Sequence, residues 1–195
     1  IIALYANSQF IGGELTKYLS YRSYIWTQTD ASRCGLLPFV YDENFSFERY
    51  VDYLLEVPMY FIIRNNKYID FTGYTFKDFL EKKKINQYKP ELNDWDLHIT
   101  TVFPEVRLKS FIELRGADGG PWSRVCALPA FWTGILYDVN ILDKIYEIIK
   151  NWSYNEIQIF YENVRKNGFK TSAPNGENLI NFTKKILDLS SLGLR

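Results

Sequence analysis

The most regular alternation of apolar and polar side chains in this chain is Glu105-Val106-Arg107-Leu108-Lys109-Ser110-Phe111-Ile112-Glu113-Leu114-Arg115. Successive side chains of a strand point to opposite faces, so the pattern predicts a strand across residues 105–115. Glu113 and Arg115 then share one face, about 7 Å apart at ~3.3 Å per residue. The sequence therefore predicts an acidic and a basic side chain presented together.

This pair of side chains has two interpretations. A carboxylate can bind a hard cation such as Mg²⁺, and a neighbouring guanidinium can hold a phosphate oxygen, so one strand could present both halves of a metal–phosphate site. The alternative is a solvated sheet face with a cross-strand ion pair. Spacing alone favours the second interpretation, because charged strand faces are common.

The segments after this strand are rich in glycine and then in apolar residues. Gly116-Ala117-Asp118-Gly119-Gly120-Pro121 predicts a turn, and its position before a helix could offer backbone N–H groups to an anion. It lacks dinucleotide-binding or P-loop spacing, so a plain tight turn is favoured. Residues 122–137 are apolar on nearly every face, which predicts a buried helix kinked at Pro129.

The rest of the chain alternates between helical and extended patterns without an internal repeat. We expect a strand at the start of residues 1–10, a helical segment over 15–26 and a hairpin over 59–69 that turns at Asn65-Asn66. Ser46 and Ser153 have the positions of helix N-caps. The other expected helices cover 46–55, 76–83, 93–103, 140–152, the segment after Ser153, and 178–192. The mixture predicts an α+β fold.

Composition excludes several classes of protein. The chain has 195 residues, 47% of them hydrophobic, and its 23 basic and 23 acidic residues give a formal net charge of zero. This excludes disorder as the main state and a chain-wide basic field for nucleic acid. The apolar runs fall far short of the roughly 18 residues that span a bilayer, so we expect neither a nucleic-acid nor a membrane partner.

A few single residues have more than one interpretation. Arg22 lies among aromatic residues, where it could clamp a carboxylate or extend to solvent. His98 is the only histidine, and packing or capping is favoured over a role as catalytic base. Cys126 is expected to be a buried small hydrophobe, and Cys34, in a loop beside Arg33, could be reactive.

Seven collinear blocks of this sequence resemble one enzyme family, the glutamate–cysteine ligases of the plant and proteobacterial type. The similarity runs from about Ala6 to Lys170. The blocks are 19–27 (Leu-Ser-Tyr-Arg-Ser-Tyr-Ile-Trp-Thr), 35–40 (Gly-Leu-Leu-Pro-Phe-Val), 47–53 (Phe-Glu-Arg-Tyr-Val-Asp-Tyr), 57–61 (Val-Pro-Met-Tyr-Phe), 103–109 (Phe-Pro-Glu-Val-Arg-Leu-Lys), 113–122 (Glu-Leu-Arg-Gly-Ala-Asp-Gly-Gly-Pro-Trp) and 126–132 (Cys-Ala-Leu-Pro-Ala-Phe-Trp).

The resemblance implies a fold, a reaction and roles for three residues. The fold is glutamine-synthetase-like, with an antiparallel sheet curved around the active site. The reaction joins the γ-carboxylate of glutamate to the amine of cysteine with ATP and Mg²⁺, through γ-glutamyl phosphate, as the first step of glutathione synthesis. Glu113 is then a Mg²⁺ ligand, Arg115 a catalytic residue at the phosphoryl or glutamate end, and Arg22 a clamp on a glutamate carboxylate. The resemblance reverses the preference that spacing alone gave for Glu113 and Arg115.

The resemblance also implies an incomplete enzyme. The match begins about midway through the family's chain, so we expect residues 1–195 to be the C-terminal portion of one catalytic domain, inactive without its N-terminal half. We expect a cytoplasmic protein, since no basic segment followed by an apolar run opens the sequence. The alternatives are a related γ-glutamyl or other carboxylate–amine ligase, such as that of ergothioneine synthesis, and an inactive fragment or binding module.

Overall fold

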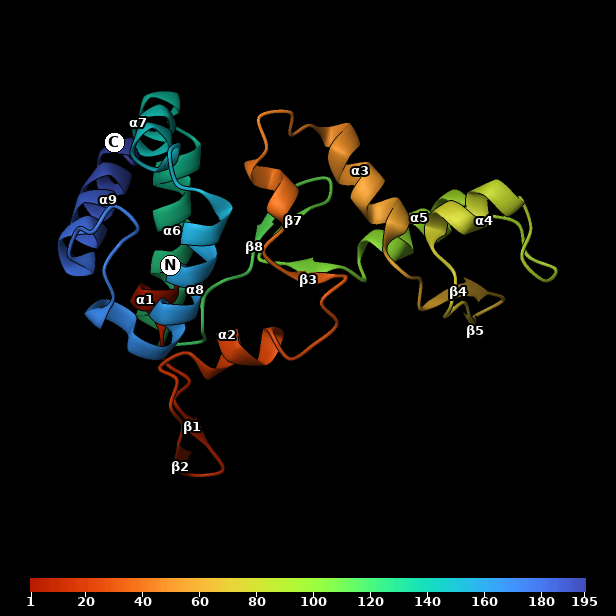
Figure 1. The fold of residues 1–195 in the computed structure, drawn as a ribbon, viewed down its shortest axis with the longest axis horizontal. Helices are drawn as coiled ribbons and strands as arrows, with labels where there is room; N and C mark the ends of the chain where they lie inside the picture. Colours follow the sequence, from red (N-terminus) through yellow and green to blue (C-terminus); the bar gives the residue numbers. More distant parts are fainter. The chain divides into compact units, whose positions relative to one another are not determined.

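A computed structural model describes residues 1–195, and the chain folds into two compact units (Figure 1). Unit 1 comprises Ile1–Ile25 and Gly116–Arg195, and unit 2 comprises Trp26–Arg115. The chain therefore passes from one unit to the other twice, inside a short helix and just after Arg115.

Unit 1 is mainly helical. Its elements are α1 (Ile2–Tyr5), β1 (Phe10–Ile11), β2 (Glu14–Leu15), α2 (Tyr21–Trp26, which ends in unit 2), α6 (Trp122–Leu136), α7 (Val139–Ile149), α8 (Tyr154–Asn167), the 3₁₀ helix η2 (Gly168–Lys170) and α9 (Leu179–Gly193). The strands β1 and β2 form an antiparallel hairpin. The core of the unit contains Ile2, Val164, Ala173, Leu179 and Phe182, contributed by α1, α8, α9 and the segment before α9.

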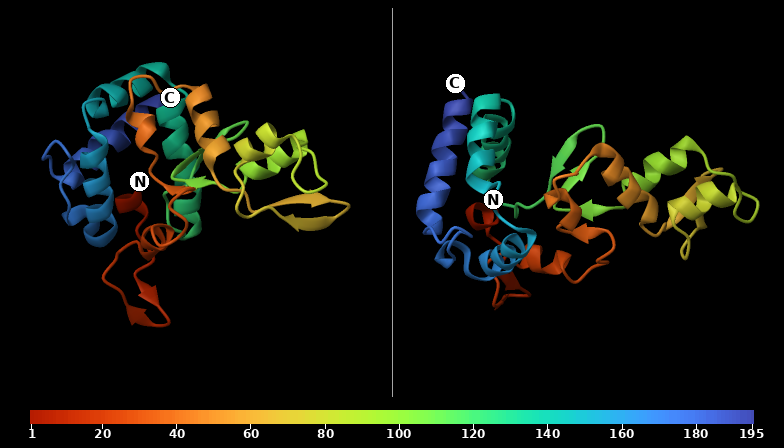
Figure 2. Two further views of the ribbon diagram at one scale, coloured as in Figure 1. Left: turned by 45° about the vertical axis from the view of Figure 1, so that its right-hand side comes forward. Right: turned by 45° about the horizontal axis from the view of Figure 1, so that its top comes forward.

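Helices α6 and α9 run side by side, as both views of Figure 2 show. Glycine makes this close approach possible. A Cβ added at Gly134 would lie 2.0 Å from the Ser190 carbonyl oxygen, and one added at Gly193 would lie 2.0 Å from the Gly134 carbonyl oxygen. Any larger residue at either position would push the two backbones apart. The Ser190 hydroxyl fastens the pair further by donating to the Phe131 carbonyl at 2.8 Å.

Unit 2 mixes helices with short two-stranded sheets. Its elements are β3 (Cys34–Gly35), the 3₁₀ helix η1 (Pro38–Tyr41), α3 (Phe47–Glu56), β4 (Phe61–Arg64), β5 (Lys67–Asp70), α4 (Phe76–Lys82), α5 (Leu92–Ile99), β6 (Phe103–Pro104), β7 (Val106–Leu108) and β8 (Ile112–Leu114). β4–β5 and β7–β8 are antiparallel, whereas β3–β6 is parallel. The expected α+β class is confirmed.

The buried side chain of Arg33 ties unit 2 together. Its side chain is 1% exposed, and its Nε donates to Asp30 Oδ2 at 2.7 Å. Nη1 donates to the carbonyl and hydroxyl oxygens of Thr101, both at 3.2 Å, and Nη2 donates to the Pro58 carbonyl at 2.6 Å. The guanidinium also lies 3.8 Å from the centre of the Tyr60 ring. A buried charge is tolerated here because nearly every N–H has an acceptor.

Several local predictions are confirmed. Ser46 caps α3 by accepting from the Arg49 N–H, and Ser153 and Glu156 form a capping box at the start of α8. Asn65 and Asn66 make the β4–β5 turn with φ of 51° and 59°, a left-handed conformation that asparagine tolerates. The helices expected over 76–83, 93–103, 140–152 and 178–192 are present, with no end shifted by more than four residues.

Other predictions are wrong in instructive ways. The strand expected at the start of the chain is the helix α1, and the helical segment expected over 15–26 begins only at Tyr21, after β2. The expected strand over 105–115 is two strands, β7 and β8, folded into a hairpin that turns at Lys109-Ser110-Phe111. The alternation of apolar and polar residues continues through the turn, because residues paired across a hairpin lie on the same face of the sheet.

The helix over 122–137 is present with Pro129 inside it, but it is not buried along its length. Trp122 is 78% exposed, and only Gly134 and Ile135 are buried. None of the helices taken singly combines the length and the apolar character that a membrane span requires; α6 and α7 do so only as a pair, across a break where they bend by 89°.

Replacing Arg33 with methionine should destabilise unit 2. The variant leaves the buried Thr101 carbonyl and the Pro58 carbonyl without this donor, so we expect Arg33→Met to lower the free energy of unfolding of the 195-residue chain by about 3 kcal/mol. Urea unfolding followed by tryptophan fluorescence measures this. The exposed Arg49 is the matched control, and its Arg49→Met variant should change stability by less than ~0.5 kcal/mol. Equal losses in the two variants would contradict the role of Arg33.

Candidate functional site

A carboxylate lies between two guanidinium groups in the β7–β8 hairpin of unit 2. Arg107 of β7 pairs directly with Glu113 of β8 in the hairpin register. Arg107 donates from both Nε, at 2.8 Å, and Nη2 to Glu113 Oε2. Arg115 donates from Nη1 to Glu113 Oε1 at 2.7 Å. Glu113 and Arg115 are therefore brought together, as the strand pattern predicted, and Glu113 also makes the cross-strand ion pair of the alternative interpretation.

The two arginines of this cluster have different surroundings. Arg107 is 8% exposed, and its Nη1 donates to the carbonyl oxygens of Thr100 and Val102 at 2.9 and 3.0 Å. Arg115 lies over the aromatic rings of Trp26 and Phe103, 5.0 and 5.3 Å from their centres. Arg107 thus fastens the hairpin to the end of α5, whereas aromatic faces orient Arg115.

Glu113 is ionised at neutral pH. Burial alone would raise its pKa, but the hydrogen bonds and charges of Arg107 and Arg115 outweigh burial and hold the pKa below its ordinary value. A carboxylate offers about four lone-pair positions, and the two arginines use three of them, leaving one on Oε1. The Glu113 side chain is 28% exposed. An ionised, partly exposed oxygen with a free lone pair fits one ligand position of Mg²⁺, which commonly uses one or two carboxylates together with water and phosphate.

The chain does not supply a complete metal centre by itself. No group of three or more His, Cys, Asp or Glu side chains is arranged to hold a metal ion. A divalent cation bound at Glu113 would therefore need further ligands from phosphate, water or other polypeptide.

Arg22, the predicted carboxylate clamp, belongs to unit 1. It is the second residue of α2, and its backbone N–H donates to the Ser8 hydroxyl at 3.0 Å. Tyr18, Tyr21 and Tyr24 surround this part of the chain, with the rings of Tyr18 and Tyr24 stacked 4.1 Å apart. The rings of these tyrosines pack on one another. Contacts of the Arg22 guanidinium with an aromatic ring or a substrate stay predictions.

Sequence reasoning missed one acidic residue in unit 1. Asp118 is 7% exposed, and its carboxylate accepts hydrogen bonds from the Ser8 and Ser20 hydroxyls, both at 2.6 Å. The predicted tight turn at 116–121 is absent, and the segment has no regular secondary structure. One feature of the sequence could have indicated Asp118: it is the one charged residue in a run of small residues. A buried charge in such a segment needs hydrogen-bond donors from other parts of the chain.

The remaining candidates have structural roles or ordinary surroundings. His98 is 3% exposed, its Nε2 lies 2.8 Å from the Leu54 carbonyl, and its ring stacks on Phe76. Burial lowers the pKa of His98, so it is neutral at neutral pH, and the preference for a packing role is confirmed. Cys126, expected to be buried, is exposed, and Cys34 is half-buried.

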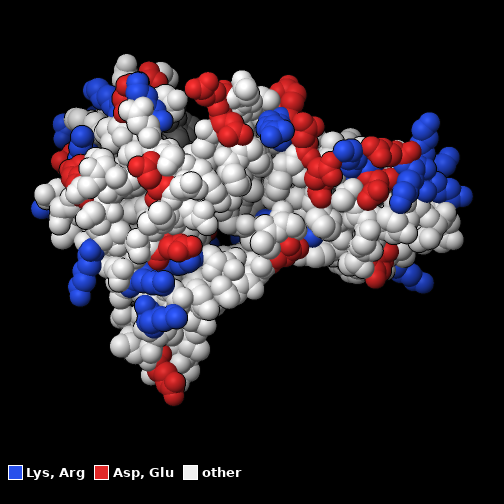
Figure 3. Space-filling view, in the orientation of Figure 1, with Lys and Arg blue, Asp and Glu red and all other residues white.

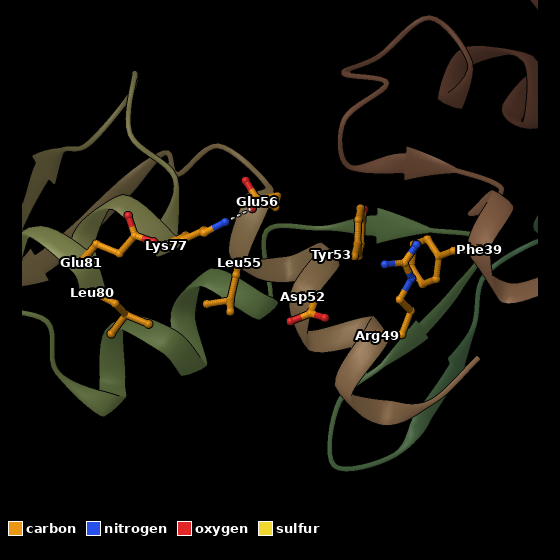
Figure 4. A pocket seen from close by; sticks show the side chains of 9 residues that line it. All are labelled: Phe39, Arg49, Asp52, Tyr53, Leu55, Glu56, Lys77, Leu80 and Glu81. Carbon is orange, nitrogen blue, oxygen red and sulfur yellow. Dashed lines mark hydrogen bonds and ion pairs between the residues drawn. The ribbon is translucent and has the colours of Figure 1, made fainter. Parts of the chain in front are cut away.

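Unit 2 also has an open groove between α3 and α4, with a volume of about 790 Å³ (Figure 4). Its charged residues are of both signs, and Lys77 is paired with Glu56 at 2.6 Å. Figure 3 shows acidic and basic side chains interspersed along the same region. The groove is lined by Phe39, Arg49, Asp52, Tyr53, Leu55, Glu56, Lys77, Leu80 and Glu81. Three carboxylates against two cations do not suit a phosphate chain, and none of the predicted site residues lines this groove.

The lowered pKa of Glu113 predicts an acid-sensitive contribution to stability. A group whose pKa falls on folding stabilises the fold above its unfolded pKa, about 4.3 for glutamate, and this stabilisation is lost as pH falls through the folded value. We therefore expect the stability difference between the chain and its Glu113→Gln variant to be largest at neutral pH and to shrink below about pH 4.3. Urea titrations at several pH values measure it. A stability difference that does not change with pH would contradict the clamped carboxylate.

The chain is similar over nearly its whole length to plant enzymes. It is 52% identical over 194 residues to glutamate–cysteine ligase A, chloroplastic, of Oryza sativa subsp. indica, covering 98% of this chain and 39% of that protein. It is 53% identical over 176 residues to the glutamate–cysteine ligase, chloroplastic, of Nicotiana tabacum, which covers 89% of this chain and 34% of that protein. It is 50% identical over 194 residues to the glutamate–cysteine ligase, chloroplastic, of Arabidopsis thaliana, which covers 98% of this chain and 37% of that protein. These relatives are named chloroplastic, which contradicts the cytoplasmic location expected from the sequence.

The family model that matches the chain covers residues 1–192. The chain spans less than two-fifths of the length of the relatives above, so it carries one part of such a protein's sequence. By this match, and by the identity of half of its residues to those relatives, the chain belongs to glutamate–cysteine ligase family 2.

Proposed function

We propose that this chain forms part of an ATP- and Mg²⁺-dependent ligase that joins the γ-carboxylate of glutamate to the amine of cysteine. The observation that carries the proposal is the Glu113 carboxylate held ionised beside Arg115, in a chain that belongs to a glutamate–cysteine ligase family. One ligand for a hard cation and one donor for a phosphate oxygen then stand at a single position of the fold.

The reaction has two balanced steps. An oxygen of the glutamate γ-carboxylate attacks the γ-phosphorus of ATP, the bond to the ADP oxygen breaks, and γ-glutamyl phosphate and ADP result. The cysteine amine then attacks the acyl carbon, phosphate leaves with the bonding pair, and the nitrogen gives up a proton to form the amide. Phosphorylation is needed because a carboxylate oxygen is a poor leaving group, whereas phosphate is a good one.

Arg115 is the residue suited to the transferring phosphoryl group. Its Nη1 is engaged with Glu113, and its guanidinium plane is held against Trp26 and Phe103, so the group is oriented before a substrate arrives. A preorganised guanidinium stabilises charge on phosphoryl oxygens without the cost of reorganisation. When bound, Mg²⁺ neutralises charge on the phosphates, and Glu113 holds it there.

Arg22 serves the other substrate. A guanidinium binds a carboxylate through two parallel hydrogen bonds, a geometry that lysine does not reproduce. We assign the α-carboxylate of glutamate to Arg22, whose backbone N–H is held at the start of α2 by the Ser8 hydroxyl.

The rest of the catalytic domain is a necessary part of this proposal. We propose that the antiparallel pairs β4–β5 and β7–β8 of unit 2 belong to the curved antiparallel sheet of a glutamine-synthetase-like fold, completed by sequence that this chain does not contain. That sequence is also the proposed source of the further metal ligands. The two-stranded sheets support this, because isolated pairs of strands are only marginally stable.

A chimera tests the function. In it, this chain replaces the aligned part of the Arabidopsis thaliana enzyme, to which it is 50% identical. We expect ADP release that requires both glutamate and cysteine, and a product that contains the γ-glutamyl amide bond. ADP release unaffected by omitting glutamate would overturn the ligase proposal. Release that requires glutamate but is satisfied better by another amine would indicate a related γ-glutamyl ligase, and a folded chimera without activity would indicate an inactive segment.

Replacing Arg22 with lysine should weaken glutamate binding in this chimera. Because lysine loses the bidentate geometry, we expect Arg22→Lys to raise the KM for glutamate about tenfold while the KM for ATP changes by less than about twofold. Initial rates at varied glutamate and ATP measure both constants. Arg49→Lys, an exposed arginine of α3, is the control. An unchanged glutamate KM in the Arg22 variant would remove this residue from the site.

A further inference from the structure

We propose that Asp118 is a positioning residue for glutamate binding, because it fixes the first turn of the helix that carries Arg22. This inference rests on the function proposed above and adds a residue to the same site. All of the groups involved, from Asn7 to Asp118, belong to unit 1.

Asp118 is a buried carboxylate whose partners are neutral donors. Oδ2 accepts from the Asn7 backbone N–H at 2.9 Å and from the Ser8 hydroxyl at 2.6 Å, and Oδ1 accepts from the Ser20 hydroxyl at 2.6 Å. The residue is only 7% exposed. No lysine or arginine lies within ion-pair distance of it. The position of this charge therefore depends on the two hydroxyls and the one amide, and it orients them in turn.

The two serines that bind Asp118 are the capping groups of α2. The Ser8 hydroxyl oxygen accepts from the Arg22 N–H at 3.0 Å, and the Ser20 hydroxyl oxygen accepts from the Ser23 N–H at 3.3 Å. The Tyr21 N–H donates to the Ser8 carbonyl at 3.1 Å. The first three N–H groups of α2 are thus satisfied by two serines, and each serine hydroxyl has its proton directed to Asp118.

The shortness of α2 makes this cap decisive. The helix has six residues, and isolated helices of that length are not stable in water. The orientation of α2 must therefore come from contacts outside the helix. The cap provides such contacts at Arg22, which is the second residue of the helix. Losing an N-cap interaction destabilises the helix that it begins. Without the cap, the first turn of α2 frays. The backbone of Arg22, from which the guanidinium side chain extends, is then no longer held in place.

Asp118 also connects this cap to the cluster described in unit 2 through the sequence. It follows Arg115 by three residues, in the segment Arg115-Gly116-Ala117-Asp118. A second bond holds the same segment, since the Asn7 side-chain amide donates to the Gly119 carbonyl at 3.1 Å. One short loop therefore carries a proposed phosphoryl-binding residue at one end and the cap of the glutamate-binding helix at the other.

The test uses Asp118→Asn in the active chimera and in the 195-residue chain. Asparagine keeps the size of the side chain but presents an N–H₂ group to one of the three donors. We expect the KM for glutamate to rise about tenfold, with kcat and the KM for ATP changed by less than about twofold. Hydrogen exchange at the Arg22 and Ser23 amides of the chain should accelerate about tenfold.

Two further variants separate positioning from general stability. Ser8→Ala removes the link between Asp118 and Arg22, so it should raise the glutamate KM in the same direction, and Asp118→Asn should add little to it. Asp138→Asn is the matched control, because Asp138 caps α7 of the same unit by accepting from the Ile141 N–H at 3.0 Å. That variant should leave the glutamate KM unchanged.

The outcomes distinguish this inference from the proposed function. A wild-type chimera without glutamate-dependent ADP release overturns the proposed function, and the positioning role falls with it. An active chimera in which Asp118→Asn leaves the glutamate KM unchanged, or lowers kcat and kcat/KM equally for both substrates, overturns the positioning role alone. Unchanged hydrogen exchange at Arg22 and Ser23 contradicts the capping geometry itself.

Discussion

The carboxylate of Glu113 lies between two guanidinium groups, and the arrangement of the β7–β8 hairpin depends on it. Arg107 reaches Glu113 across the hairpin and continues to the carbonyl oxygens of Thr100 and Val102, which fastens the hairpin to the end of α5. Arg115 holds the other oxygen. The hydrogen bonds between Glu113 and the two arginines thus hold the hairpin in place and keep the carboxylate ionised. The local structure and the proposed chemistry therefore depend on the same three side chains.

The sequence predicts those parts of the fold that depend on near neighbours in the chain. The Ser46 and Ser153 caps, the Asn65-Asn66 turn and most helices follow from local patterns, and all are confirmed. It fails where a pattern is compatible with two structures. A two-residue alternation over 105–115 fits both one strand and a hairpin, and only the pairing of Arg107 with Glu113 distinguishes them.

The candidate site shows the same division. Glu113 and Arg115 were identified from their spacing and from a family resemblance, and they do contact each other. Arg33 and Asp118 were missed, because each acquires its role from partners distant in sequence: Thr101 and Pro58 for Arg33, and Ser8 and Ser20 for Asp118. A charged residue gives no sign in the sequence of which carbonyl or hydroxyl groups will surround it. The burial of these side chains is a property of tertiary structure alone.

The central claim is that the clamped carboxylate of Glu113 serves the cation of the proposed reaction as well as the hairpin. The most direct measurement is the Mg²⁺ concentration that gives half-maximal ADP release by the chimera, compared between wild type, Glu113→Gln and Glu43→Gln at matched folded fractions. We predict that Glu113→Gln raises this concentration at least about tenfold, whereas Glu43→Gln leaves it unchanged. A folded Glu113→Gln chimera with the wild-type Mg²⁺ requirement would contradict the account.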